Sequence, residues 1–135
     1  MIRAFADTSY FVALLSQKDR YHEKVHRLNQ EIDFRIVTSD WVIVELANSF
    51  RHPRNRRDVA DLIEALLSDS EVEVVSSEGT DMRQGLTLFR NRQDKSWSLT
   101  DCISFVIMRE KGLTDALTSD HHFEQAGFVA HLIEC

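Results

Sequence analysis

The chain has 135 residues and carries 16 Lys and Arg against 22 Asp and Glu, a formal net charge of −6. This length fits one domain over residues 1–135 that buries its core without disulfides, and the acidic balance argues against broad nonspecific binding to nucleic acid unless a local basic patch supplies the contact. Because Cys102 and Cys135 lack the spacing of a disulfide framework, and because neither a signal peptide nor an apolar run of roughly 20 residues occurs, we expect a cytoplasmic protein with no membrane segment.

Apolar periodicity in the first half of the chain predicts strands that alternate with helices. Short apolar runs predict strands over residues 2–6 and 34–38. Helical spacing of apolar residues predicts helices over residues 10–16, 21–30, 41–50 and 59–67. Pro53 and Asn55 separate the last two helices, while Ser39 and Asp40 favour a helix start.

The second half of the chain continues this alternation. Strands are predicted over residues 71–75, 116–118 and 128–133, helices over 81–91 and 98–111, and a helical turn over 121–125. The helix over 98–111 is apolar nearly all round, so we expect it to be buried, and Gly112 supplies its end. The alternation predicts an α/β fold, in which a parallel sheet of about four or five strands has helices on both faces.

Two of the predicted strands are followed by an acid. Asp7 follows the first strand, and Asp120 follows the strand that precedes the helical turn. Parallel α/β sheets bind ligands at the carboxyl ends of their strands, so both carboxylates would face one crevice if these strands are neighbours. A competing interpretation is that Asp7 caps the next helix, a position for which Thr8 and Ser9 are also suited.

Two further acids lie on predicted helices. Asp101 comes three residues after Ser98, a spacing typical of a capping box, so a purely structural role is a strong alternative. Glu45 interrupts the apolar residues Val44 and Leu46 in a helix with little polar surface. A buried, unpaired carboxylate costs several kcal/mol, so we expect a cation or strong hydrogen-bond donors beside Glu45.

The four acids together have the chemistry of a divalent metal site. A ligand set made only of oxygens suits Mg²⁺ or Mn²⁺. Carboxylates that lie close together raise one another's pKa unless a positive charge sits among them. The acids are far apart in the sequence, so only the fold can assemble such a site. We interpret His121 and His122 as a polar surface turn rather than part of a nucleophilic triad.

Four segments together resemble one known family: DTS after the first strand, then VIVELANSF, SWSLTDCISF and ALTSDHHF. They are similar to segments of PIN-domain proteins, most closely the VapC-like toxin ribonucleases of type II toxin-antitoxin modules, and the resemblance covers nearly the whole chain. It implies a PIN-like three-layer sandwich. It also implies a ribonuclease that depends on Mg²⁺ or Mn²⁺, with an RNA substrate, a cognate antitoxin protein as partner and a homodimeric state.

The resemblance also assigns roles to single residues. Its metal-site acids are Asp7, Glu45, Asp101 and Asp120, with Thr8, Ser9 and Thr118 as polar support. A metal held by such acids lowers the pKa of a bound water, which then attacks a phosphodiester bond. Glu45 or Asp120 is the carboxylate that would orient or deprotonate this water.

One basic stretch interrupts the acidic chain. Arg51, Arg54, Arg56 and Arg57 all fall within residues 51–57. Arg56 and Arg57 lie near a predicted helix start, where the helix dipole disfavours cations, so an external anion is one explanation. Contact with the RNA backbone, docking of a partner and a merely solvated face all remain open.

Two other functional classes also remain open. Mg²⁺-dependent phosphotransfer domains place Asp at strand ends, but they use paired acids such as DxD and a positioned Lys, whereas Asp7 is followed by Thr8 and Ser9. A noncatalytic module could use the acids to bind a metal, RNA or a basic partner segment. Metal-dependent cleavage of RNA, or phosphate trapped on Asp7, would separate these classes.

Overall fold

The computed structural model describes residues 1–76 and 78–133. The strands of this part are β1 (Ile2–Ala6), β2 (Phe34–Ser39), β3 (Glu73–Val75), β4 (Asp115–Leu117) and β5 (Val129–Ala130). The helices are α1 (Thr8–Leu15), α2 (His22–Glu31), α3 (Asp40–Ser49), α4 (Pro53–Ser68), α5 (Thr80–Asn91), α6 (Leu99–Glu110) and α7 (His121–Gln125). Cys102 is buried as a free thiol, and Cys135 lies outside the described residues.

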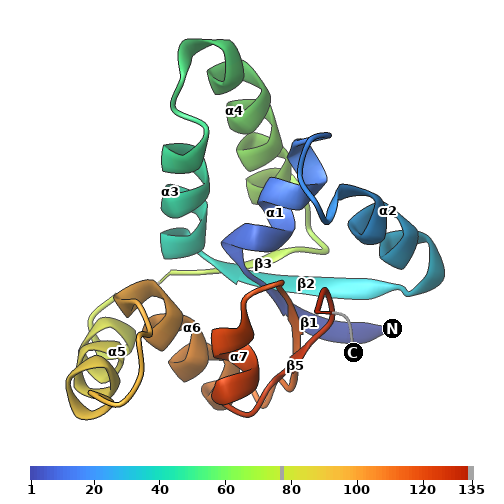
Figure 1. Cartoon of the computed structure of the whole chain (residues 1–135). Coiled ribbons are helices and arrows are strands. Elements are labelled where there is room, and N and C mark those ends of the chain that lie inside the picture. Colours follow the sequence, from blue (N-terminus) through green and yellow to red (C-terminus); the bar gives the residue numbers. More distant parts are fainter. Residues whose placement is uncertain (77, 134–135) are drawn as a thin grey trace.

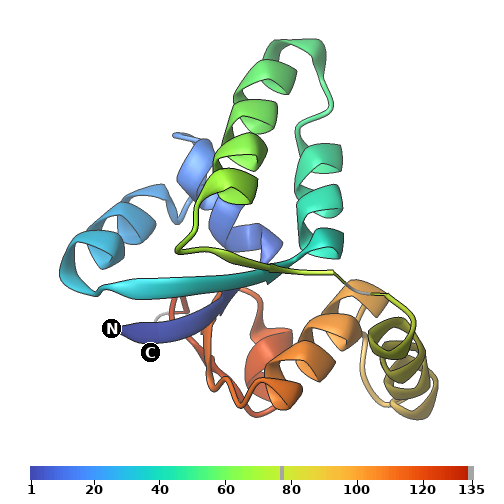
Figure 2. The same cartoon turned by 180° about the vertical axis from the view of Figure 1, so that it is seen from behind.

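The strands form one five-stranded sheet in the order β3-β2-β1-β4-β5, and every neighbouring pair is parallel. Helices α1 to α4 cover one face of the sheet and α5 to α7 cover the other (Figures 1 and 2). Burial on both faces explains the apolar run Ala4, Phe5 and Ala6 in the central strand β1. The predicted α/β fold is thereby confirmed. Within the described residues, no helix has the length and apolar character that crossing a membrane requires.

The sheet changes its winding direction between β1 and β4. The chain leaves β1 through helices on one face and enters β4 from helices on the opposite face (Figure 1). Such a switch point leaves a crevice at the carboxyl ends of the two strands. Ala6 pairs with Leu117 across them, and the side chains of the next residues, Asp7 and Thr118, are hydrogen-bonded to each other.

Aromatic packing fixes the two helices that carry the later acids. Phe123 of α7 packs against Phe5 of β1 and Phe105 of α6, with ring centroids 6.5 Å and 4.9 Å away. All three side chains are fully buried. Because one set of rings joins the sheet, α6 and α7, close packing of the core sets the positions of Asp101 and Asp120 near the starts of these helices.

Two glycines stand where the structure needs them. A Cβ atom on Gly85 in α5 would lie 2.6 Å from Cγ1 of Ile103 on α6, so glycine permits the close approach of these helices. This explains why a residue that weakens a helix stands in its middle. Gly112 has a φ of +66° and follows Lys111, the C-cap residue of α6, which confirms the predicted end of this helix.

Two element boundaries differ clearly from the predicted ones. α4 begins at Pro53, well before the predicted start, because proline suits the first turn of a helix and the His52 side chain accepts a hydrogen bond from the Arg54 amide. β5 has two residues and is shorter than predicted. A turn ends it, closed by a hydrogen bond of 3.3 Å from the Ile133 amide to the Ala130 carbonyl.

Candidate active site

A pocket of about 390 Å³ opens at the switch point of the sheet. It is lined by Asp7, Thr8, Ser9, Val12, Asp19, Arg20, Tyr21, Glu45, Asp101, Ser119 and Asp120. These residues come from the end of β1, from α1 and the connection to α2, from α3, from α6 and from the connection between β4 and α7. The fold therefore brings the four acids singled out in the sequence to one pocket.

Asp7 is a buried acid at the point where β1 passes into α1, with 5% of its surface exposed. It holds the N-cap position, but its carboxylate makes no capping hydrogen bond, so the capping interpretation is wrong for this side chain. Burial raises the pKa of Asp7 to about 7. The charges of Asp101 and Asp120 act in the same direction, whereas hydrogen bonds from the Thr8 backbone and the Thr118 hydroxyl lower the pKa.

Two hydroxyl groups hold the Asp7 carboxylate. Thr118 Oγ1 donates to Asp7 Oδ2 at 3.0 Å, and Ser9 Oγ lies 3.3 Å from the same oxygen and 3.1 Å from Thr118 Oγ1. The Ser119 amide donates to Ser9 Oγ at 3.1 Å. The Asp120 amide donates to Thr118 Oγ1 at 3.0 Å. Ser9 therefore contacts the site acid rather than capping α1, which begins at Thr8 instead of near Tyr10.

Asp101 combines a helix cap with a place in the pocket. Its Oδ2 accepts a hydrogen bond of 3.2 Å from the Ser98 amide, and its own amide donates to Ser98 Oγ at 3.0 Å. The predicted capping box is thus present. The Asp101 residue is only 8% exposed, and burial followed by the charge of Asp120 raises the pKa of its carboxyl. Capping and exposure to the pocket do not exclude each other here.

His122 is a site neighbour that the sequence did not reveal. Its Nδ1 lies 3.2 Å from Asp101 Oδ2 and 3.2 Å from Asp120 Oδ1, and its side chain is 20% exposed. Its backbone amide also donates to Asp120 Oδ1 at 2.9 Å. The interpretation as a polar surface turn fits the exposed His121 and is wrong for His122. No local pattern signals the difference, because it depends on the approach of α6 to α7.

Glu45 lines the pocket from α3, but its side chain is exposed. The expectation that this carboxylate is shielded from water is therefore wrong. The sequence around Glu45 is misleading because Trp41 and Val44 are also solvent-exposed, at 37% and 49%. An apolar neighbourhood in the sequence thus reflects apolar residues on the surface of α3 and not burial of the acid.

Thr8 carries a buried hydroxyl with an unused hydrogen-bonding capacity. Among the described residues, its Oγ1 is the buried side-chain polar atom that has no hydrogen-bond partner. Such an atom costs about 1–3 kcal/mol, and Thr8 lines the pocket, so this arrangement fits a ligand bound there. Carboxylate and hydroxyl oxygens are a donor set for Mg²⁺ or Mn²⁺. The residues present therefore fit a divalent cation.

The potential ligand atoms are spread over the pocket. Within the described parts of the chain, one group of ligand-type side chains has donor atoms that all lie within 4.8 Å of one another. This group consists of Asp120, His121 and His122, and the four acids do not form such a group. Mg²⁺ keeps several waters when it binds to proteins and takes one or two carboxylates directly. Wide spacing of the acids is compatible with contacts through such waters.

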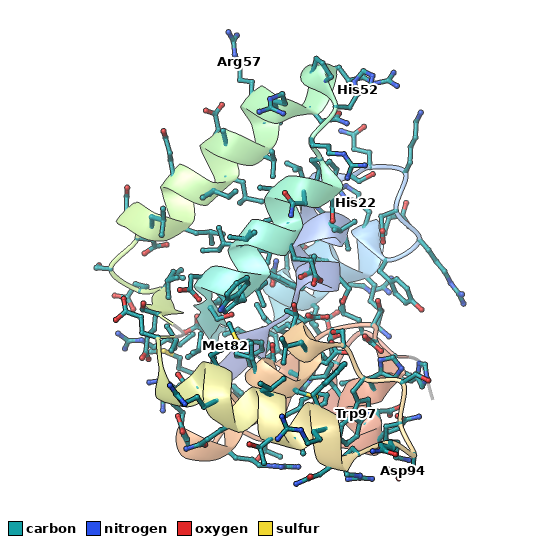
Figure 3. The ribbon with its side chains drawn as sticks, turned by 90° about the vertical axis from the view of Figure 1, so that its left-hand side faces the viewer. His22, His52, Arg57, Met82, Asp94 and Trp97 are labelled. Atoms are coloured by element: carbon teal, nitrogen blue, oxygen red, sulfur yellow. The ribbon has the colours of Figure 1, made fainter. Side chains whose placement is uncertain are left out.

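The four arginines do not join the acids. They lie where α3 ends and α4 begins, and Figure 3 shows Arg57 at the outer end of this helix pair. Arg51, Arg56 and Arg57 line a second pocket of about 510 Å³ together with apolar residues of both helices. Arg56 donates to the Arg51 carbonyl at 3.0 Å, and Arg51 donates to the Asn48 carbonyl at 3.3 Å. Two of the guanidinium groups therefore hydrogen-bond the backbone at the end of α3.

Comparison with known proteins agrees with this architecture. The Mycobacterium tuberculosis protein named 23S rRNA-specific endonuclease VapC20 is 30% identical over 126 residues, which are 93% of this chain and 95% of that protein. The crystal structure of Mycobacterium tuberculosis VapC20, described as a Sarcin-Ricin loop cleaving toxin, has a TM-score of 0.85 at 27% identity and covers 93% of this chain and 96% of that one.

A second solved structure is similar in fold alone. VapBC2 from Rickettsia felis, bound to a DNA fragment from its promoter, has a TM-score of 0.64 at 15% identity and covers 98% of this chain and 96% of that one. A sequence model of the PIN domain matches residues 4–129. The resemblance to VapC-like PIN-domain ribonucleases is confirmed, and this chain belongs to the PIN domain family.

Proposed function

We propose that this protein is an endoribonuclease that hydrolyses RNA phosphodiester bonds with Mg²⁺ or Mn²⁺, and that it acts as the toxin of a toxin-antitoxin pair. The observation that carries the proposal is the buried Asp7 in an acid-lined pocket at the switch point of a PIN-domain sheet. The name of the VapC20 relative, an endonuclease specific for 23S rRNA, supports RNA as the substrate. The VapC20 crystal structure is described as that of a Sarcin-Ricin loop cleaving toxin, and we extend this RNA substrate to the present chain as part of the proposal.

The proposed roles of the acids follow from their surroundings. Asp7, Glu45, Asp101 and Asp120 would hold the cation. When bound, the cation would lower the pKa of a coordinated water and offset negative charge on the reacting phosphate. Asp7 is fixed by the Thr118 hydroxyl, so its oxygens are oriented before any ligand arrives. Thr8 would give its free hydroxyl to the same ligand shell.

Glu45 is the better candidate for the general base. Its exposed carboxylate lines the pocket and can turn to take a proton from the attacking water. Asp120 Oδ1 is instead engaged by the amide and Nδ1 of His122. Replacing Glu45 by Gln is expected to lower the cleavage rate more than it lowers metal affinity.

The direct test is cleavage of cellular RNA and of intact ribosomes by the purified protein. Cleavage should need added Mg²⁺ or Mn²⁺, stop with excess chelator and be lost in Asp7→Asn. Sequencing of new RNA ends would identify the cut site. Cleavage that persists in chelator or in Asp7→Asn would overturn the proposed site, and RNA binding without cleavage under any divalent metal would leave only a binding module.

The arginine stretch is a second proposed part of RNA binding. Arg51, Arg54, Arg56 and Arg57 are all exposed, and they gather positive charge on an acidic protein. The backbone hydrogen bonds of Arg51 and Arg56 leave Arg54 and Arg57 as the cations best able to meet a phosphate. Docking of an acidic partner segment is the competing outcome, because the neighbouring pocket also has apolar residues.

Partners and location complete the proposal. A cognate antitoxin protein is supported by the description of the VapC20 relative as a toxin. A homodimer is supported by large apolar side chains on the helix surfaces, among them Trp41, Val44 and Leu67. A cytoplasmic location agrees with the free Cys102 thiol. Expression of the chain alone should arrest growth, and co-expression of the antitoxin should relieve the arrest.

A phosphotransfer domain has less support. Such a domain would need a lysine at the acid site, but Lys111 pairs with Glu73 at 2.6 Å. Neither Lys111 nor Lys95 is among the described residues that line the acidic pocket.

A further inference from the structure

Arg20 has an unusual position for a cation in this molecule. Among the described residues that line the acidic pocket at the switch point of the sheet, Arg20 is the single side chain of the Lys and Arg type. The carboxylates of the same lining are those of Asp7, Asp19, Glu45, Asp101 and Asp120. RNA carries one negative charge per phosphate, and walls of the same sign repel it. Arg20 is therefore the protein cation in this pocket that could bind a substrate phosphate next to the scissile one.

Arg20 is held in place by an aromatic ring and not by an acid. Its guanidinium carbon lies 5.4 Å from the ring centroid of Tyr21, within the range of a cation-π contact. Tyr21 is half-buried and packs against the hydrophobic core, so its ring is a fixed platform. Within the described residues Arg20 forms no ion pair, and its side chain is exposed. Its charge is therefore available to an external anion.

The connection that carries Arg20 is ordered by its own hydrogen bonds. The Asp19 amide donates to the Ser16 carbonyl and the His22 amide donates to the Asp19 carbonyl, both at 3.1 Å. Asp19 Oδ1 accepts from the Tyr21 amide at 2.9 Å, so the adjacent acid is committed to the turn before α2. The connection thus presents the guanidinium and the ring at the pocket as one unit.

We propose that Arg20 is the contact for a backbone phosphate of the RNA strand next to the scissile bond, and that Tyr21 positions its guanidinium. This inference rests on the proposed ribonuclease function and adds a substrate-binding residue outside the four acids. A guanidinium can give two parallel hydrogen bonds to phosphate oxygens, which fixes the register of the strand as well as its charge. The contact of 5.4 Å with the Tyr21 ring is the observation that supports this positioning role.

The test measures binding of a short single-stranded RNA of mixed sequence in the Asp7→Asn background, in which no cleavage is expected. Arg20→Gln should weaken binding about tenfold at low salt, as expected for loss of a charge-assisted hydrogen bond. It should also reduce the slope of log affinity against log salt by roughly 0.7 to 1, the effect of one lost phosphate contact. Lys18→Gln is the matched control, because Lys18 is exposed on the same connection and does not line the pocket.

Tyr21 is tested as a positioning residue by a pair of substitutions. Tyr21→Phe keeps the ring and should bind RNA like the parent, whereas Tyr21→Leu should bind more weakly. The loss in Tyr21→Leu should largely disappear when Arg20 is already Gln, because the two residues act through one guanidinium. Additive losses would show that Tyr21 acts independently of Arg20 and would overturn its proposed role.

The outcomes separate this inference from the broader proposal. If the wild-type protein cleaves RNA with a divalent metal and Arg20→Gln binds RNA no worse than Lys18→Gln, the role of Arg20 is wrong and the ribonuclease function stands. If the wild-type protein neither binds nor cleaves RNA, both are wrong. With Asp7 intact, Arg20→Gln and Lys18→Gln should bind Mn²⁺ with equal affinity. A lower Mn²⁺ affinity in Arg20→Gln alone would show that Arg20 acts on the metal site instead.

Discussion

Thr118 Oγ1 donates a hydrogen bond of 3.0 Å to Asp7 Oδ2, although 111 residues separate the two in the chain. Both residues follow paired positions of neighbouring strands, since Ala6 of β1 lies beside Leu117 of β4. The hydroxyl is fully buried and also accepts the Asp120 amide, so it links two acids of the pocket. This contact ties the first strand to the last third of the chain and orients the most buried carboxylate of the site.

Removal of this hydroxyl should weaken metal binding while leaving the fold intact. Thr118→Val keeps the shape of the side chain but removes the donor that lowers the pKa of Asp7. Because a metal needs the ionised carboxylate, affinity for Mn²⁺ near pH 7 should fall about 10- to 100-fold, the usual effect of losing a group that orients a ligand. Calorimetry would measure this loss. Thr118→Ser restores the hydroxyl and should bind Mn²⁺ nearly as well as the wild type. Equal Mn²⁺ affinity of Thr118→Val and the wild type would contradict the role of this hydroxyl.

The metal-free protein should lose stability as the pH rises through the range set by Asp7. Its pKa is about 7 when folded and about 3.9 in an unfolded chain, so the folded state holds the proton more tightly between these values. The free energy of unfolding should therefore fall from about pH 4 to pH 7 and stay lower above it. Asp7→Asn should remove this decline and be more stable at pH 8, by at most about 4 kcal/mol.

Denaturant unfolding of both proteins at pH 4 and pH 8 measures this difference. Glu64→Gln on the exposed surface of α4 is the control, because it removes a carboxylate from outside the pocket. Added Mn²⁺ should stabilise the wild type more than Asp7→Asn at pH 8. If the free energy of unfolding differs between Asp7→Asn and wild type by the same amount at pH 4 and pH 8, Asp7 does not titrate in this range.

Gly85→Ala should destabilise the fold even though alanine favours helices. The added Cβ atom would lie 2.6 Å from Cγ1 and 3.2 Å from the backbone of Ile103, so α5 and α6 must move apart. Overpacking of this kind costs about 1–3 kcal/mol, against a gain of about 1 kcal/mol in helix propensity. Thermal unfolding should show a lower midpoint for Gly85→Ala than for the exposed neighbour Gln84→Ala. Ile103→Ala removes Cγ1, so Gly85→Ala should lower the unfolding midpoint less in an Ile103→Ala background than in the wild type.

The arginine stretch should separate RNA binding from partner docking. Arg54→Ala combined with Arg57→Ala should weaken RNA binding and flatten its dependence on salt if these cations meet phosphates. Binding of the antitoxin, measured in parallel, should then change little. Unchanged RNA affinity at several salt concentrations, with weaker antitoxin binding, would assign the pocket beside α4 to the partner instead.

Several features followed from local sequence patterns alone. Apolar runs ending at Asp7, helical spacing after Ser98 and a glycine at position 112 are set by hydrogen bonding and burial within a few residues, so the alternation of strands and helices was predictable. Asp7, Asp101 and Asp120 were also identified from their places at the ends or starts of these elements, and Glu45 from its place within an apolar helix. Element boundaries followed less closely from the apolar pattern, because α4 begins at Pro53, where a proline and the His52 cap start the helix before its apolar residues.

The surroundings of the acids depended on the tertiary structure. The order of the strands places Thr118 against Asp7, and the approach of α6 to α7 places His122 between Asp101 and Asp120. The turn before α2 brings Arg20 to the pocket. The sequence thus determined which side chains stand at the ends of its elements, because that is local chemistry. Their neighbours, burial and pKa values came only with packing, because these quantities depend on residues that are distant in the chain.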